Sequence, residues 1–328
     1  MKTLRGALTH GVLLTLCAVF ILPFVWLVLT SVKSEAHMMR YPPEWLPRTE
    51  FVRRDDGRWW EIQQSEDLAA KGAPGRLRVK VTDRTGRTTE TITIRADERV
   101  VRAVPLARHY LTGLTSFDFA LFLQNSLWVC AVSVVATVAS SSLIAYAFSI
   151  LRWRGRDLCF YAMLGTMMLP SQVTMVPVFL IFRRLGLVDT FVPLLAGSFC
   201  GNAFFVFLLR QFFLTIPKDL IEAARMDGCS DWRVYWQIVL PLSVPALAVV
   251  ALFTFLAQWN DYLGPLIYLV DEAKYTLALG LAMFQGQYTT QYGELMAMSV
   301  LLTLPVVALF FFAQKTFIQG IKTTGSKG

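Results

Sequence analysis

The chain has 328 residues, of which 55% are hydrophobic and only 16% are charged, and its formal net charge is +8. Soluble domains carry about 25% charged residues, so this composition excludes an ordinary soluble protein and indicates an integral membrane protein. The positive charge gathers in short loops beside apolar segments, so it reports membrane orientation and gives no reason to expect nucleic-acid binding.

Six uncharged, mostly apolar segments are long enough to cross a membrane. Crossing a hydrocarbon core of about 30 Å takes roughly 20 residues, and without water the backbone must satisfy its polar groups as a helix. We therefore predict an all-α polytopic membrane protein with six transmembrane helices within 11–32, 119–151, 158–182, 190–209, 234–260 and 295–314. A seventh uncharged stretch, 275–293, is rich in Gly, Gln and Thr, and we expect an interfacial or re-entrant excursion there.

Lys and Arg residues in short loops predict the orientation of these helices. They occur before the first helix, between the second and third, between the fourth and fifth, and after the sixth. Because short cytoplasmic loops carry an excess of Lys and Arg, these four segments, and with them both termini, are expected in the cytoplasm.

The chain starts with a membrane anchor followed by a long loop. Residues 1–32 hold two cations and then an apolar run longer than the about 7–15 residues of a signal peptide, so a retained first helix is expected. Residues 33–118 carry both signs of charge. A loop of this length escapes the charge rule, so we predict that it is exported.

The exported loop is predicted to contain a small β-rich insert at about 51–104. Apolar and polar residues alternate over 77–81 and 88–95, on either side of turn-forming residues, which predicts a β-hairpin. Trp59 and Trp60 either cover the apolar face of this hairpin or stack on sugar rings.

Residues 119–320 are predicted to form a core of five helices. Small residues at 139–142, together with Ala145, allow other helices to approach the first of these five closely. The next helix carries Pro170 and Pro177 with polar residues between them. Such irregularity is tolerated in a membrane where a helix lines a cavity or is buried in protein. This helix therefore either borders a transport path or packs, kinked, on its neighbours.

Five polar side chains in the apolar segments are candidates for the translocation path. They are Gln172, Thr174, Asn202, Gln258 and Asn260. Amides and hydroxyls can bond the hydroxyl groups of a sugar. For the last two, which lie at the end of the fifth helix, capping of that helix end is the alternative role.

Residues 217–241 form a polar, helix-prone island between two apolar segments. Pro217 lies near the start of a predicted helix, where the missing N–H is tolerated, and Gly228 lies where that helix can end in a left-handed residue. Ser230 can then cap a second short helix whose first turn carries Asp231. The island is therefore predicted to be two short helices broken at a glycine, lying across one membrane face.

The island also resembles a known motif. Glu222, Ala223 and Ala224 are followed by Gly228 and then by Ile238, Leu240 and Pro241, with the spacing of the EAA loop of permease subunits in binding-protein-dependent ABC importers. Further segments are similar to the carbohydrate-uptake branch, and specifically to the smaller permease subunit of maltose-type systems: 41–47, 125–126, 183–189, 259–260, 275–281 and 327–328. The insert at 51–104 departs from the short first exported loop of that family.

The resemblance implies a type I ABC importer permease fold in the bacterial plasma (inner) membrane. It implies four kinds of partner: a second similar permease, two cytoplasmic ATPase subunits, an extracytoplasmic solute-binding protein and a sugar substrate. ATP and Mg²⁺ would bind to the ATPase subunits, and this chain would hold no cofactor. The tail, 321–328, resembles a cytoplasmic tail that touches the ATPase subunits.

The resemblance also assigns roles to individual residues. Contact with the ATPase falls to Glu222, Ala223, Ala224, Asp227 and Gly228, within the coupling loop 217–241. Contact with the binding protein falls to Gln285, Gly286 and Gln287, within the exported loop 262–294.

The expected function is ATP-driven import of a sugar or oligosaccharide by alternating access, with no enzymatic activity in this chain. The three histidines show no metal-ligand spacing, and the tail lacks the residue order of a phosphate loop. Three alternatives stay open: an ABC permease for another solute such as glycerol phosphate or a polyamine, a secondary transporter, and a membrane-anchored receptor.

Overall fold

The computed structural model describes residues 2–33, 38, 45–47, 49–53, 59–68, 74–82, 89–102, 107–286 and 290–324. The chain divides into two compact units. The first unit contains Met1–Asp118 and Leu281–Thr303, and the second contains Phe119–Gly280 and Leu304–Gly328.

The first unit contains two long helical segments and one short helix. Helix α1 spans Lys2–Ser31, α3 spans Arg108–Ser116, and α15, whose first turns belong to this unit, spans Tyr292–Thr324. Within Thr9–Ser31 of α1, the most apolar 18-residue window is not buried by any part of the chain that the structure describes, whereas Thr30 and Ser31 at its end are buried.

A buried polar cluster ties these three helices together. The His109 Nε2 atom lies 2.8 Å from the Lys33 carbonyl oxygen, and His109 Nδ1 lies 3.3 Å from Glu294 Oε1. A carbonyl only accepts, so Nε2 carries a hydrogen, and the contact at Nδ1 requires one further proton shared with the carboxyl group. Gly293 leaves room for the imidazole, because a Cβ there would overlap the ring of His109.

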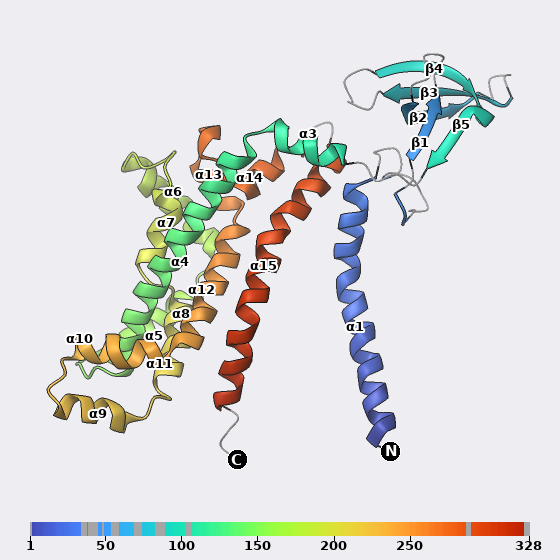
Figure 1. Ribbon diagram of the computed structural model, residues 1–328. Coiled ribbons are helices and arrows are strands. Elements are labelled where there is room, and N and C mark those ends of the chain that lie inside the picture. The colour runs from blue at the N-terminus through green and yellow to red at the C-terminus, as the bar shows by residue number, and fades with distance from the viewer. Residues whose placement is uncertain are drawn as a thin grey trace. The chain divides into compact units, whose positions relative to one another are not determined.

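The insert in the first unit is a single antiparallel sheet. Its strands are β1 (Thr49–Arg53), β2 (Trp59–Asp67), β3 (Arg76–Thr82), β4 (Thr89–Arg95) and β5 (Arg99–Arg102), in the order β4-β3-β2-β1-β5 (Figure 1). The predicted hairpin is confirmed: β3 pairs with β4 from Arg76↔Arg95 to Thr82↔Thr89. Its predicted turn lies outside the described residues. A 3₁₀ turn, Ala96–Glu98, leads into β5, which pairs with β1.

One face of this sheet is its core. Val79 and Val81 are fully buried, and Val52 and Ile94 lie beside them. Trp60 belongs to the same cluster and is 8% exposed, so this tryptophan packs inside the insert. On either side of the buried Val79, Arg78 and Lys80 are exposed, as period-two alternation requires.

The second unit is a helical bundle built around α4. Its helices are α4 (Phe119–Ser149), α5 (Arg156–Thr166), α6 (Ser171–Arg184), α7 (Val192–Phe199), α8 (Ala203–Phe213), α9 (Lys218–Met226), α10 (Asp231–Val234), α11 (Leu240–Leu242), α12 (Val244–Trp259), α13 (Leu263–Tyr268) and α14 (Leu277–Ala282), the last of which runs into the first unit. Helix α4 packs against α7, α8 and α12, with α9 and α10 towards one of its ends and α13 towards the other (Figure 1).

The membrane-spanning pattern agrees with the six predicted segments. Four candidates occur in the described residues: Thr9–Ser31, Phe119–Ser149, Val192–Phe213, which includes the break between α7 and α8, and Tyr292–Phe312. The third and fifth predicted helices are instead bent pairs, with a bend of 97° between α5 and α6 and of 78° between Asp231–Leu242 and α12. Pro170 lies within the first break, and Leu169 before it is not helical, because proline disfavours the helical conformation of the preceding residue. At the second bend Ser243 interrupts the helix, and Pro245 lies in the first turn of α12, where its missing N–H is tolerated.

The seventh uncharged stretch does not form a further membrane-crossing helix. Its helix α14 has six residues and covers about 9 Å. This length fits the predicted excursion.

The small residues of α4 allow the close helix approach that their pattern predicts. Ser141 and Ala145 are fully buried. Ser140 Oγ donates to the Ser198 carbonyl at 2.8 Å, and the Asn202 N–H donates to Ser141 Oγ at 3.2 Å. These bonds fix the end of α7 and the start of α8 on α4.

Candidate functional site

The coupling loop ends its first helix as the sequence predicts. Gly228 has φ +82°, and its N–H donates to the Arg225 carbonyl at 3.0 Å, while the Cys229 N–H donates to the Ala224 carbonyl at 2.9 Å. This pair of bonds is the Schellman arrangement, which satisfies carbonyls at the end of α9. A side chain at position 228 would meet open space but strained backbone.

The second short helix also begins as predicted. Ser230 Oγ accepts from the Arg233 N–H at 3.3 Å and caps α10. The Asp231 carboxylate lies 2.8 Å from Arg225 of α9, so an ion pair bridges the glycine turn. The two short helices are therefore held together across the turn, and we call this unit the α9–α10 piece.

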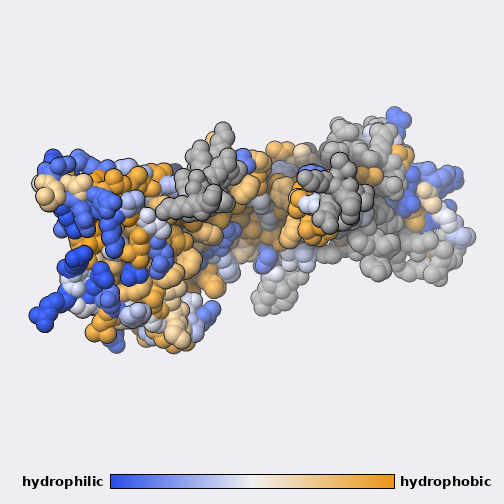
Figure 2. All heavy atoms as spheres, turned by 90° about the horizontal axis from the view of Figure 1, so that it is seen from below, coloured by the Kyte–Doolittle hydropathy of each residue, from blue (hydrophilic) through white to orange (hydrophobic). Residues whose placement is uncertain are grey.

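The two faces of α9 have different surroundings. Ile221 and Ala224 are buried in the core of the bundle. Glu222 and Ala223 are exposed, and Met226 at the end of the helix is 89% exposed. Hydrophilic residues gather over this end of the bundle, with hydrophobic ones around them (Figure 2). A surface with an exposed methionine beside a carboxylate suits a protein partner.

This geometry separates the residues that the EAA resemblance groups together. Glu222, Ala223, Asp227 and Gly228 lie at the exposed surface, whereas Ala224 lies against the chain's own bundle. The small side chain of Ala224 packs α9 on the bundle. Contact with the ATPase stays a prediction for all five residues.

Residues 270–277, in the loop predicted to be exported, rest on a platform centred on Asp189. This residue adopts a left-handed backbone, φ 63°, which Asp tolerates better than most residues. Its carboxylate accepts from the N–H groups of Asp271 at 2.9 Å and Val270 at 3.0 Å, and it lies 2.6 Å from Lys274 Nζ. The Asp271 N–H and the Lys274 ammonium lower the pKa of Asp189 to about 2.

Helix α4 holds the other side of the same loop. Asn125 Nδ2 donates to the carbonyls of Ala273 at 2.9 Å and Tyr275 at 3.0 Å. Ser126 Oγ accepts from the Leu277 N–H at 2.8 Å. Three of the family-like segments, at 125–126, 183–189 and 275–281, thus meet at one place, which their separation in the sequence does not reveal.

The predicted binding-protein contacts come later in the sequence, in the first unit. Gln285 and Gly286 are exposed, and Gln285 forms a backbone bridge with Thr290. Gln287 lies outside the described residues. The described part of this tip is therefore a short exposed turn.

The five path candidates lie on separate elements. Gln172 and Thr174 are exposed on the first turn of α6. Asn202 caps α8, since its Oδ1 accepts from the N–H groups of Phe204 and Phe205. Asn260 Nδ2 donates to the Leu256 carbonyl at 2.8 Å at the end of α12, where Gln258 is half-buried. Asn202 and Asn260 thus have structural roles, and solute contact stays a prediction for all five.

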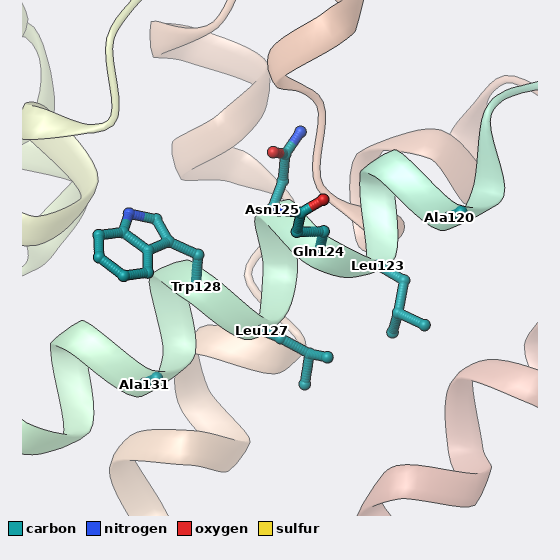
Figure 3. Close-up of a pocket in the computed structure, with 7 residues that line it drawn as sticks. All are labelled: Ala120, Leu123, Gln124, Asn125, Leu127, Trp128 and Ala131. Atoms are coloured by element: carbon teal, nitrogen blue, oxygen red, sulfur yellow. The ribbon is translucent and has the colours of Figure 1, made fainter.

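A hollow of about 590 Å³ lies along the N-terminal half of α4. Figure 3 shows Leu123 and Leu127 projecting from one side of the helix, while Asn125 projects elsewhere. Among the described residues, the lining of this hollow comes from α4 and includes none of the five path candidates. It is an uncovered face of one helix and is not an enclosed solute site.

The Asp189 platform predicts graded protection of two backbone amides. Replacing Asp189→Asn keeps an acceptor oxygen but loses the charge that faces Lys274, whereas Asp189→Ala loses both. Hydrogen exchange at Val270 and Asp271 should therefore quicken from the unaltered chain to Asn to Ala. Equal exchange in all three would contradict the platform.

The same amides should respond to acid only at very low pH. The folded pKa of about 2 lies below the ordinary value of 3.8, so the carboxylate stabilises the loop fully above about pH 4 and stops doing so as the pH falls through 2. Amide protection, corrected for intrinsic exchange, should stay constant between pH 7 and 4.

Comparison with known proteins identifies the family. The model of the "Binding-protein-dependent transport system inner membrane component" family matches residues 138–323. A crystal structure of a bacterial ABC transporter involved in the import of the acidic polysaccharide alginate contains a chain that superposes with a TM-score of 0.68 at 23% identity, over 96% of this chain and 97% of that chain. At this identity the likeness shows the fold.

Curated relatives are transport permeases. The arabinooligosaccharides transport system permease protein AraQ of Halalkalibacterium halodurans is 37% identical over 204 residues, 62% of this chain and 73% of AraQ. The lactose transport system permease protein LacG of Rhizobium radiobacter is 31% identical over 204 residues, 62% of this chain and 74% of LacG. The sn-glycerol-3-phosphate transport system permease protein UgpE of Yersinia enterocolitica is 35% identical over 219 residues, 65% of this chain and 76% of UgpE.

The family model covers more than half of the chain, including the coupling loop and every helix from α5 to α14. The chain therefore belongs to the inner membrane components of binding-protein-dependent transport systems.

Proposed function

We propose that this chain is a permease subunit of an ATP-driven ABC importer that moves a sugar or oligosaccharide into the cytoplasm. An extracytoplasmic binding protein delivers the solute, and the permease opens alternately to either side. The exposed face of α9 carries this proposal, because it offers Glu222, Ala223 and Met226 to a partner while the opposite face is fixed on the bundle.

We infer the other subunits of the importer from this surface and from the family. Two ATPase subunits bind the α9–α10 piece of this chain and of a second permease. ATP and Mg²⁺ bind to the ATPases. Both termini and the coupling loop then lie in the cytoplasm, as the positions of Lys and Arg indicate. The turn with Gln285, Gly286 and Gln287 lies on the opposite side and contacts the binding protein.

The break between α5 and α6 is the basis on which we infer the position of the solute path. Met168 is 85% exposed at the break, and Gln172 and Thr174 are exposed just after it. Irregular backbone inside a membrane occurs where it is buried in protein or lines a water-filled cavity, and does not occur against lipid. The break therefore faces the second permease or the path between the two permeases.

A second candidate solute is sn-glycerol 3-phosphate. The likeness to UgpE, which is as high as 35% identity, supports it as directly as the likeness to LacG supports a sugar. Both solutes carry several hydroxyl groups, so polar side chains such as Gln172 and Thr174 suit either.

Uptake into proteoliposomes tests the solute. The complete importer should accumulate labelled arabinotriose or lactose only in the presence of internal ATP and the binding protein. Accumulation of sn-glycerol 3-phosphate alone would favour the second candidate. Uptake driven by an ion gradient without ATP would contradict an ABC importer.

The left-handed turn predicts a graded loss of coupling at position 228. Backbone strain for ordinary residues there is about 1–2 kcal/mol, and Asn tolerates the conformation better than a β-branched residue. Uptake should therefore fall from Gly228 to Gly228→Asn to Gly228→Val, while membrane insertion is kept. Gly197→Val, at ordinary helical backbone with open space around it, is the matched control. Normal uptake by Gly228→Val would contradict a coupling role.

Substitutions of the two alanines of the EAA segment should have different effects. Ala223→Leu adds volume on the exposed face, so copurification with the ATPase should drop while the melting temperature of the chain is kept. Ala224→Leu overfills the buried face, which costs about 1–3 kcal/mol, so the melting temperature should drop. Identical behaviour of the two variants would contradict this division of α9.

A further inference from the structure

Helix α4 is one continuous membrane-spanning helix. Its 31 residues contain neither glycine nor proline. The other three candidate spans contain Pro23, Pro193 and Pro305. Since proline is a main cause of helix kinks, the backbone of α4 lacks this cause of bending. At 1.5 Å per residue it is about 46 Å long, well over the membrane core of about 30 Å.

One end of α4 is bonded to the coupling loop. The Tyr146 hydroxyl donates to the Asp231 carbonyl at 2.8 Å, and Ser142 Oγ lies 2.8 Å from the Tyr235 hydroxyl. The two tyrosine rings are in contact, with centroids 5.2 Å apart, and both residues are 3% exposed. Because Asp231 also pairs with Arg225, this end of α4 is connected to both short helices.

The opposite end of α4 is bonded to the exported loop. Asn125 holds the carbonyls of Ala273 and Tyr275, and Ser126 holds the Leu277 N–H. Phe122, 1% exposed, lies against the Tyr275 ring with centroids 5.9 Å apart. Figure 3 shows Asn125 pointing away from the side of α4 that Leu123 and Leu127 occupy. The loop is thus fixed to α4 by three hydrogen bonds and a ring contact.

On the basis of the proposed import function, we propose that α4 is a rigid connecting rod between the ATPase-facing loop and the loop that precedes the binding-protein contact. Tyr146 and Tyr235 are positioning residues at one end, and Asn125 is the positioning residue at the other. Tyr146 and Asn125 lie about 31 Å apart along the axis. Movement of α9 and α10 displaces α4 along its whole length, and α4 carries residues 273–277 with it.

The test is a double-mutant cycle across the rod in the complete importer. Tyr235→Phe removes one hydroxyl, and Asn125→Asp keeps the side-chain shape but replaces the donor to two carbonyls by an acceptor. ATP hydrolysis is measured without the binding protein and with binding protein loaded with arabinotriose, lactose or sn-glycerol 3-phosphate, whichever the unaltered complex imports. Tyr161→Phe, on an exposed tyrosine of α5, is the matched control.

Tyr235→Phe should reduce stimulation by the loaded binding protein about fivefold, the equivalent of one typical hydrogen bond, and Asn125→Asp, which loses two bonds, should reduce it at least as much. Basal hydrolysis should be unchanged in both. The double variant should lose no more stimulation than the more affected single variant, because a rod released at one end transmits nothing further. Distant independent sites instead combine additively in free energy. A loss in the double variant equal to the product of the two single losses, or full stimulation in the single variants, overturns the rod.

A replacement variant and the behaviour of the unaltered complex keep the test decisive. If Tyr235→Phe prevents assembly, Tyr146→Phe breaks the neighbouring bond to Asp231 and should give the same loss of stimulation. If the unaltered complex shows no stimulation by any loaded binding protein, the proposed function itself fails, and the rod fails with it. Stimulation in the unaltered complex that survives in every variant overturns the rod alone.

Discussion

Each break between helices leaves backbone groups without a partner in their own helix, and α4 satisfies several of these groups in this chain. Its serines bond the break between α7 and α8, and Tyr146 bonds the carbonyl at the start of α10. At its other end Asn125 bonds two carbonyls of the exported loop. One unbroken helix thus allows its neighbours to be broken.

The side chains of α4 that form hydrogen bonds to other elements occur in two groups. Asn125 and Ser126 bond residues 273–277, and Ser140, Ser141 and Ser142 lie where the bundle and the coupling loop meet. Between the groups, the buried positions are Val129, Cys130, Ser133, Ala136 and Thr137. The coupling loop is fixed in the same way, with Gly228 ending α9 and the Arg225–Asp231 pair closing the turn.

Much of this fold could be predicted from the sequence, because length, charge and hydropathy act locally. The six apolar segments, the hairpin of β3 and β4, and the turn at Gly228 depend on nearby residues. The inward face of Ala224 could not be predicted, since it depends on which side of α9 meets the bundle. The Asp189 platform joins residues far apart in the sequence, and only an unusual left-handed aspartate marks it in the structure.

The pairing of β1 with β5 has a consequence for how this chain diverged from its relatives. Thr49 stands opposite Arg102, so the polypeptide enters and leaves the sheet at neighbouring strand positions, whose Cα atoms are only about 5 Å apart in such a pair. A module whose two ends lie close together can be gained or lost in evolution as one unit. The distance between the segments that flank it does not have to change. The insert is therefore free to diversify at its surface while its attachment points stay constant.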